Sequence, residues 1–370
     1  MTAPIQSAQE PVLLSGSIHV LLQFDVSEEI RLDRLREIIS APTVRQPALK
    51  HPAPGYVRYK RPPVVEPSEP LVLETGERLH GEIKYYDYGV VSVLLQHPFS
   101  GPWDSLIALT SRWTWETDFA AHASQIVRRR LETVSPALIK PYSEWLSEDY
   151  LIVHVRHITG MPEAPELIAC HGSRIAQVVR GDTQPLSRNE CQEVLQSSIS
   201  YYPTDLAIIG WNAALVYDTP SGAEAAIQLL EYANSQLLEF RHYDDLLTRV
   251  LDEVYDNFEQ RTGLFTGFRR AGSANRLHAV LLDVMELTEH ADNAIKFLSD
   301  MFAARLYRLA AAKVGVPDYK DLVTQKINTA EDLYRFMVDQ FNQSRAFFLE
   351  SAVVIILVIE LIYLFRGKGF

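Results

Sequence analysis

The C-terminal stretch from Ile327 to Phe370 constrains the fold most, because it joins a heptad pattern to a long apolar run. Apolar or small residues recur at a and d spacing over about three heptads, which is typical of a helix that packs against other helices. These positions are Ile327, Ala330, Tyr334, Met337, Phe341, Ser344 and Phe348. The next part, Phe347 to Phe365, is apolar over about nineteen residues, enough for a helix to cross a hydrocarbon core of about 30 Å. This run predicts a transmembrane helix.

Charged residues in and after this run decide how it would meet a membrane. Glu350 lies near its start, Glu360 lies near its end, and Arg366 and Lys368 follow it. A carboxylate inside a bilayer is costly unless it is protonated, reaches the headgroups or faces a partner helix. We therefore predict a single-pass tail anchor at residues 347–366, with these four side chains in membrane or oligomer contacts and the body in the cytoplasm. The alternative is a buried C-terminal helix of a soluble bundle.

Composition narrows the class of protein. The chain has 370 residues and a formal net charge of −12. That charge argues against a general nucleic-acid coat, because such proteins need a basic surface to release counterions. Cys170 and Cys191 are too few for a disulfide framework, and the N-terminal residues lack the charged and apolar regions of a signal peptide. We therefore expect the bulk of the chain to be cytosolic.

The first 220 residues show two successions of strand, helix, hairpin and helix. The strand and hairpin segments are 17–26, 79–96, 150–157 and 206–218, and the helical segments are 27–40, 103–118, 119–134, 165–179 and 187–197. Ser27 is the expected cap of the first helix. The repeated order predicts an α+β fold whose body is duplicated as two ferredoxin-like halves. Residues 41–70 contain eight prolines and are expected to form an extended strap.

Long helices follow the body. Heptad patterns over 226–258 and 277–309 predict a helical hairpin, with Asp244 as a polar interruption that either fixes the register or turns to solvent. The predicted domains are an α+β body at 1–220 with its Pro-rich strap at 41–70, a helical hairpin and stalk at 221–346, and the transmembrane anchor at 347–366.

No familiar catalytic signature is present. The sequence has no glycine-rich dinucleotide motif after a strand, no Walker loop, no HExxH and no GxSxG. We predict no catalytic residue, no cofactor, no metal ligand and no small-molecule substrate, and we consider an enzyme less expected than a binding protein. Arg269, Arg270 and Arg276 lie in a glycine-containing connection and fit phosphate or lipid contacts, with a solvated hairpin tip as the alternative.

The hairpin at residues 81–95, GEIKYYDYGVVSVLL, places Asp87, Tyr88 and Gly89 in its turn. A tight turn at this point favours glycine, which adopts a positive φ at little cost. The hairpin resembles the aromatic-Asp-Tyr-Gly-Val-Val strand pair of the uncharacterised-domain family that includes the required-for-meiotic-nuclear-division proteins. The chain is similar to a bacterial member of that family.

The resemblance extends to the helices. Residues 237–256 and 275–300 are similar to the family's two long helices, and residues 341–365 are similar to its membrane-proximal helix with an internal Ile-Glu pair, here Ile359 and Glu360. The resemblance implies a membrane-anchored protein for which the family has no established catalytic residues. It also implies association with RNA or the ribosome, because mitochondrial relatives support translation at the inner membrane.

Together these observations predict a membrane-anchored, non-catalytic scaffold or interaction protein. We expect it to contact membrane lipid and to form a homo-oligomer through its helices. Two alternatives stay open. One is an enzyme that acts on a nucleotide or RNA in the α+β body, and the other is an ion-conducting oligomer with Glu360 in its path.

Overall fold

The computed structural model describes residues 12–39, 62–259, 279–282, 284 and 301–367. The chain divides into two compact units. The first unit, here called the body, comprises Met1–His242 and Ala291–Asp318, and the second, here called the helical unit, comprises Tyr243–His290 and Tyr319–Phe370. The fold is α+β, as predicted, with one mixed sheet in the body.

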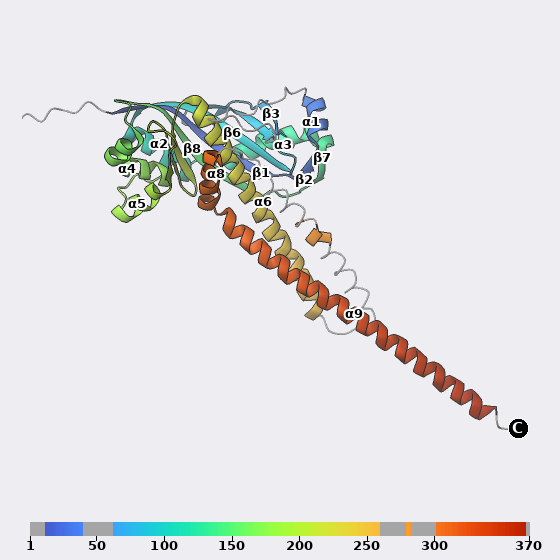
Figure 1. Cartoon of the computed structure of the whole chain (residues 1–370). Helices are drawn as coiled ribbons and strands as arrows, with labels where there is room; N and C mark the ends of the chain where they lie inside the picture. Colours follow the sequence, from blue (N-terminus) through green and yellow to red (C-terminus); the bar gives the residue numbers. More distant parts are fainter. Residues whose placement is uncertain (1–11, 40–61, 260–278, 283, 285–300, 368–370) are drawn as a thin grey trace, which may run out of the picture. The chain divides into compact units, whose positions relative to one another are not determined.

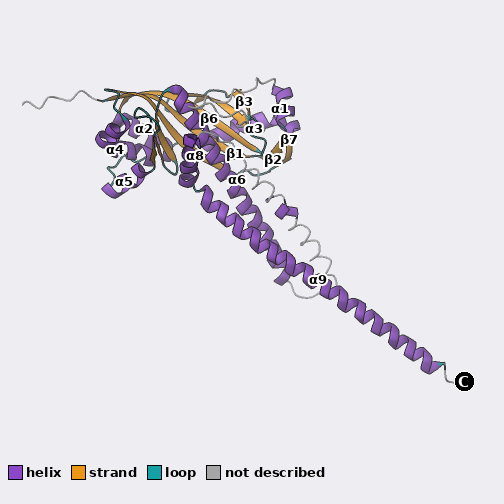
Figure 2. Ribbon diagram, in the orientation of Figure 1, coloured by secondary structure: helices purple, strands orange, loops and turns teal. Residues whose placement is uncertain are grey.

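The sheet of the body runs in the order β3-β5-β6-β1-β8-β11-β10-β9, and β4 pairs with β5 outside this path. Figure 2 shows the strands in orange. Its strands are β1 (Leu13–Asp25), β3 (Val64–Pro67), β4 (Leu71–Val72), β5 (Arg78–Tyr85), β6 (Val90–Pro102), β8 (Ser147–Ile158), β9 (Ser198–Ile199), β10 (Leu206–Ile209) and β11 (Ala213–Tyr217). A small separate sheet pairs β2 (Ser27–Ile30) with β7 (Leu138–Pro141).

The central strand β1 is buried on both faces, because its residues alternate between two packed layers. Ile18, Val20 and Leu22 lie in the main apolar core, whereas Gln23 and Asp25 are buried on the other face. That core also contains residues of helices α1 (Leu32–Ile39), α2 (Trp103–Trp115), α3 (Phe119–Val134) and α4 (Ala164–Arg180). Helix α5 (Arg188–Gln196) packs on α4, and a short 3-10 helix (Ser135–Ala137) follows α3.

The two halves of the body are not copies of one another. In the first half, β1 pairs with β6 in the antiparallel direction. In the second half, β8 pairs with β11 in the parallel direction. The short strand β9 precedes the β10–β11 hairpin and pairs antiparallel with β10, so the second hairpin enters the sheet with the opposite polarity. The predicted ferredoxin-like duplication is therefore wrong, although the order of elements is similar.

The segment after β1 also differs from the prediction. Ser27 does not cap a helix but begins β2, where it lies opposite Pro141 of β7. The helix begins later, at Leu32. Most of the predicted Pro-rich strap lies outside the described residues, and its end forms β3, which pairs with β5 at the edge of the sheet. An edge position suits Pro67, which has no N–H to donate to a second neighbour.

Among the described residues that follow, the helices are α6 (Pro220–Glu259), α8 (Met301–Val314) and α9 (Val316–Arg366). Helix α6 begins where the predicted body ends, but it continues from the body into the helical unit. Gly315 separates α8 from α9 with a φ of 97°, the left-handed conformation that glycine adopts at helix ends.

The helical unit has its own apolar core. Val250, Leu251 and Val254 of α6 cluster there with Ala330 and Met337 of α9. The partly buried residues Ile327 and Tyr334 of the predicted heptad pack against this core. The first part of the heptad pattern of α9 is therefore used within a single chain.

Asp244 does not simply turn to solvent. Its carboxylate lies 2.6 Å from Lys326 Nζ of α9, and this ammonium also donates to the Thr248 hydroxyl at 2.5 Å. Asp244 and Lys326 are 22% and 28% exposed. The pair links α6 to α9 at one register of the helical unit.

The predicted transmembrane anchor at residues 347–366 is wrong. Across the described residues, no helix combines the length and the apolar character that crossing a membrane requires. Glu350 and Glu360 lie within the apolar run of α9 and Arg366 follows it, and each charged side chain opposes transfer into hydrocarbon. The predicted single-pass membrane localisation is overturned by the same finding.

Candidate functional site

The C-terminal end of α9, residues 349–365, has a long exposed apolar surface. In the helical unit this end continues past the end of α6 (Figure 1). Its large apolar side chains are 48–76% exposed. They are Leu349, Val353, Val354, Ile355, Ile356, Leu357, Val358, Ile359, Leu361, Ile362, Tyr363, Leu364 and Phe365. Soluble proteins rarely expose a contiguous apolar patch of more than a few hundred Å² without an interaction there.

The heptad spacing of α9 continues into this end. Counting on from Ile327 and Tyr334, the a and d positions fall on Ser351, Ile355, Val358, Ile362 and Phe365. We call the last four of these the C-terminal seam. At about 100° per residue, Glu360 lies on the opposite side of the helix from this seam.

The predicted membrane or oligomer residues occupy different faces of this helix. Glu350, Glu360 and Arg366 are all exposed on α9, while Lys368 lies outside the described residues. By the heptad count, Glu350 and Glu360 fall on c and f positions, away from the seam, and Arg366 falls on an e position beside it. The structure does not bring these three charges together at one point.

The predicted turn residues Asp87, Tyr88 and Gly89 lie between β5 and β6. Gly89 has a φ of 96°, and a Cβ there would lie 1.7 Å from the Ser27 carbonyl oxygen. Its own carbonyl accepts from Val26 N at 3.1 Å. This close approach needs glycine, and it fixes the hairpin to the start of β2.

Tyr88 joins the same turn to α6. Its hydroxyl lies 2.8 Å from the Ser235 hydroxyl, and its ring stacks on Tyr86 with centroids 5.2 Å apart. Burial raises the pKa of the Tyr88 phenol well above its usual range, so the phenol stays neutral. The turn is therefore a structural contact with α6.

A buried ionic cluster, which sequence reasoning missed, lies between the sheet and α6. The Glu231 carboxylate accepts from Lys84 Nζ and from the Ser92 hydroxyl, each at 2.6 Å. The Gln23 amide donates to the Glu231 carbonyl at 2.9 Å, and Glu82 lies 3.1 Å from Lys84 Nζ. Burial disfavours the ammonium, but Glu231 and Glu82 outweigh it and raise the pKa of Lys84.

This cluster is closed to substrates in the observed state. The side chains of Lys84 and Glu231 are only 8% and 1% exposed, and they neutralise each other. The two residues are 147 positions apart, so no local pattern could pair them. The one available signal was a charged residue within each of two otherwise apolar segments.

Histidines extend the polar face of the sheet. Burial lowers the pKa of His19 to about 3, and its Nε2 lies 3.0 Å from the Ser17 hydroxyl. Nearer the end of β1, the Asp25 carboxylate lies 2.6 Å from His242 Nδ1. Burial raises the pKa of Asp25 despite this contact. The Asp25–His242 contact therefore joins α6 to β1, and all of these groups are largely buried.

A cavity of about 30 Å³ lies at the N-terminal end of α6. Its walls include Val216 and Asp218 beside β11, Gly222 of α6, and Phe302 and Leu306 of α8. A space of this size holds about one water molecule. It does not accommodate a nucleotide or another organic substrate.

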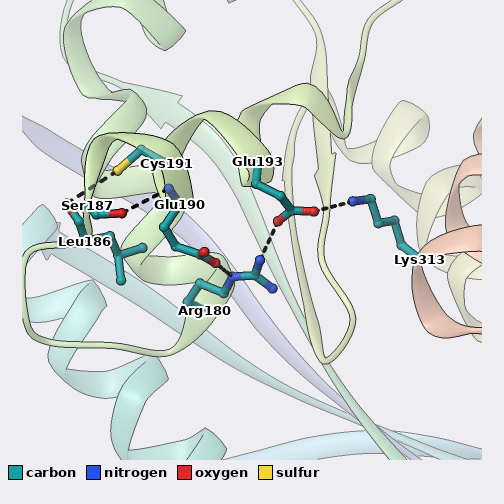
Figure 3. A network of polar contacts seen from close by, with 7 residues as sticks. All are labelled: Arg180, Leu186, Ser187, Glu190, Cys191, Glu193 and Lys313. Atoms are coloured by element: carbon teal, nitrogen blue, oxygen red, sulfur yellow. Dashed lines mark hydrogen bonds and ion pairs between the residues drawn. The ribbon is translucent and has the colours of Figure 1, made fainter.

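A polar network in the body connects α8 to the α4–α5 pair (Figure 3). Lys313 Nζ of α8 lies 2.7 Å from Glu193, and Arg180 contacts both Glu193 and Glu190. Hydrogen bonding from Lys313 lowers the pKa of Glu193. These groups are partly exposed, so the network contributes modestly to stability.

The consecutive arginines of α3 are engaged separately. Arg128 lies over the Trp145 ring at 4.4 Å, Arg129 lies 3.3 Å from Glu69, and Arg130 pairs with Glu66. The predicted phosphate or lipid contacts Arg269, Arg270 and Arg276 lie outside the described residues. No group of three histidine, cysteine or acidic residues in the described part of the chain could hold a metal ion.

Comparisons with known proteins match the body. The family model described as uncharacterized protein MJ0711, N-terminal domain, matches residues 15–224. Uncharacterized protein MJ0711 of Methanocaldococcus jannaschii is 19% identical over 190 residues, which cover 51% of this chain and 58% of that protein. The match thus spans less than two thirds of the relative. No solved structure matches this chain.

The family that matches differs in name from the family predicted from the hairpin. These matches do not confirm the resemblance to the required-for-meiotic-nuclear-division proteins or the bacterial origin. The family model nevertheless covers more than half of the 370 residues. The chain therefore belongs to the family defined by the N-terminal domain of uncharacterized protein MJ0711.

Proposed function

We propose that this protein is a non-catalytic interaction protein that self-associates through the C-terminal end of α9. The observation that carries the proposal is the exposed apolar surface of residues 349–365. A helix that is apolar on all sides is normally buried. The partner proposed here is a second copy of the same chain, because the a/d spacing of α9 continues into its exposed end.

The C-terminal seam provides the first contact between copies. Fully burying one Ile, Val or Phe side chain contributes roughly 1.5–3 kcal/mol. Ile355, Val358 and Ile362 are already about half covered, whereas Phe365 is 75% exposed. Covering the rest therefore contributes roughly 3–6 kcal/mol per copy. Since association itself costs about 4–15 kcal/mol, the seam of a dimer alone is marginal.

The other faces of the helix favour a larger assembly. Ile356, Leu357 and Leu364 are exposed on b and c positions, which a two-stranded seam leaves uncovered. Contacts through these residues add apolar burial for every further copy. We therefore expect assemblies beyond the dimer, with Glu360 on the outer, solvated side of each seam.

The test is sedimentation of the full-length chain and its variants in buffer over a wide concentration range. Ile355→Lys and Ile362→Lys place a charge in the seam and should yield a smaller species. Glu360→Lys introduces the same side chain on the opposite face and serves as the matched control. A wild-type chain that stays monomeric throughout overturns the proposal, as does equal loss of association in all three variants.

The hairpin supports a narrower form of the proposal. Its YDYGVV turn motivates kinship with the family of required-for-meiotic-nuclear-division proteins, and with it an association with RNA or the ribosome. Such a partner would make the protein a scaffold that joins its own copies to another component. Co-sedimentation of the purified chain with purified ribosomes tests this part separately, and an unchanged distribution of the chain would contradict it.

A further inference from the structure

Two tryptophans form an exposed pair on the body, apart from the features described so far. Trp115 ends α2, and Trp211 lies in the turn between β10 and β11. They are 61% and 56% exposed, and their ring centroids lie 6.4 Å apart at an angle of 47°. Tryptophan is among the side chains most enriched in the energetic centres of protein interfaces, so two adjacent exposed rings indicate a contact site.

The first ring is held by a hydrogen bond to the end of another helix. Trp115 Nε1 donates to the Gly181 carbonyl at 2.9 Å. Gly181 caps α4 with a φ of 65°, and a Cβ there would lie 2.9 Å from the Thr114 hydroxyl. The glycine thus lets the end of α4 approach the end of α2 closely, which fixes the Trp115 ring.

The second ring stands on a turn whose backbone is fixed. Gly210 N donates to the Ala213 carbonyl at 2.8 Å, and the Gly210 carbonyl accepts from the Tyr150 hydroxyl at 2.8 Å. A Cβ on Gly210 would lie 2.6 Å from a Val179 methyl group, so the turn packs directly on α4. The Trp115 ring is therefore held by its hydrogen bond, and the turn that carries Trp211 is fixed against α4, which lowers the entropy lost on binding.

Two acidic residues lie next in sequence to residues that build the pair. Glu116 follows Trp115 and is exposed, and Asp182 follows Gly181. The cations nearest in sequence are already paired, Arg112 with Glu77 and Arg180 with Glu190 and Glu193. One carboxylate therefore follows Trp115 directly, and a second follows the glycine that accepts its hydrogen bond, while those two cations are paired with other carboxylates.

We propose that the Trp115–Trp211 pair docks a basic segment of a partner protein, with an arginine or lysine side chain on the rings. A cation is attracted to an aromatic face within about 6 Å of the ring centroid. Because the two centroids are 6.4 Å apart, one guanidinium can lie within that range of both rings. Glu116 and Asp182 add the complementary charge, which favours a basic segment over a neutral or acidic one.

The test measures fluorescence anisotropy of labelled peptides that alternate glycine with arginine, lysine, serine or glutamate, titrated with the full-length chain. Arginine and lysine peptides should bind more tightly than the serine and glutamate peptides. Trp211→Ala should weaken their binding about three- to tenfold, as expected for one cation–π contact. Glu116→Gln should also weaken it, and its matched control Glu132→Gln, which removes one exposed charge from α3, should not.

Three results would overturn the proposal. Equal binding of arginine and serine peptides would show that the site does not select a cation. If Glu116→Gln and Glu132→Gln weaken peptide binding equally and Trp211→Ala does not weaken it, the binding comes from the net charge of the chain and not from the tryptophan pair. Smaller assemblies of Trp211→Ala in sedimentation would assign the pair to contacts between copies. Glu116→Gln keeps the test valid if Trp211→Ala does not fold.

Discussion

Breaking the buried ionic cluster under α6 should cost far more stability than replacing it. In Glu231→Gln, the ammonium of Lys84 loses its charged partner at 2.6 Å while its side chain is only 8% exposed. Removing one member of a buried pair costs about 3–5 kcal/mol. Glu82 remains 3.1 Å from the ammonium and partly compensates, so we expect a loss of about 3 kcal/mol.

The double variant Lys84→Met/Glu231→Leu provides the contrast. It removes both charges and fills the space with apolar side chains. Its free energy of unfolding should therefore lie within about 1–2 kcal/mol of the wild-type value. All five tryptophans lie within the body, at positions 103, 113, 115, 145 and 211. Tryptophan fluorescence during urea unfolding therefore reports on the body alone. Near wild-type stability of Glu231→Gln, or a double variant as unstable as the single one, would refute this reasoning.

Three further predictions concern the turn, one histidine and the helical unit. Gly89→Ala should lower the free energy of unfolding by at least about 3 kcal/mol in the same urea assay, because its Cβ would lie 1.7 Å from a carbonyl oxygen. A variant that unfolds at the same urea concentration as the wild type would contradict the turn geometry. The free energy of unfolding of the body should fall as the pH is lowered from 6.5 towards 3. In this range the unfolded chain binds a proton at His19 that the folded chain does not bind. His19→Leu should reduce that slope in pH-dependent urea unfolding, and an identical slope would count against the burial of this residue. Asp244→Ala should lower the free energy of unfolding of the helical unit by about 0.5–1 kcal/mol, a value discounted for partial exposure. Circular dichroism during thermal unfolding measures this loss, and adding Lys326→Met should cause no further loss. Additive losses would indicate that the two side chains are not paired.

Local patterns predicted the elements whose conformation depends on nearby residues. The apolar run of β1 and the glycine in the turn at Gly89 both follow from short-range sequence, and the structure has them at those places.

Features that depend on distant partners were missed. Ser27 lies in a strand because it pairs with β7, more than a hundred residues later, and its capping propensity is outweighed. The parallel pairing of β8 with β11 is not encoded in either strand alone. Lys84 and Glu231 meet only in the folded body.

The apolar end of α9 shows a different limit. Hydropathy indicates that its side chains avoid water, but it does not identify what covers them. The predicted anchor rested on the length of the run and allowed its carboxylates Glu350 and Glu360 to be accommodated, whereas no described helix is long and apolar enough to span a membrane. The heptad spacing indicates which face of the helix makes contacts, because it separates the C-terminal seam from the face that carries Glu360.

The accessibility of single spin labels along residues 349–366 tests self-association most directly. Each label is attached to one introduced cysteine in the full-length chain, with Cys170 and Cys191 replaced by serine. We predict that collisions with a water-soluble relaxation agent are fewest at positions 355, 358 and 362 and most frequent at 360, with the period of a helix. Uniformly high accessibility at all of these positions, at concentrations where the chain should be assembled, would contradict the proposed association.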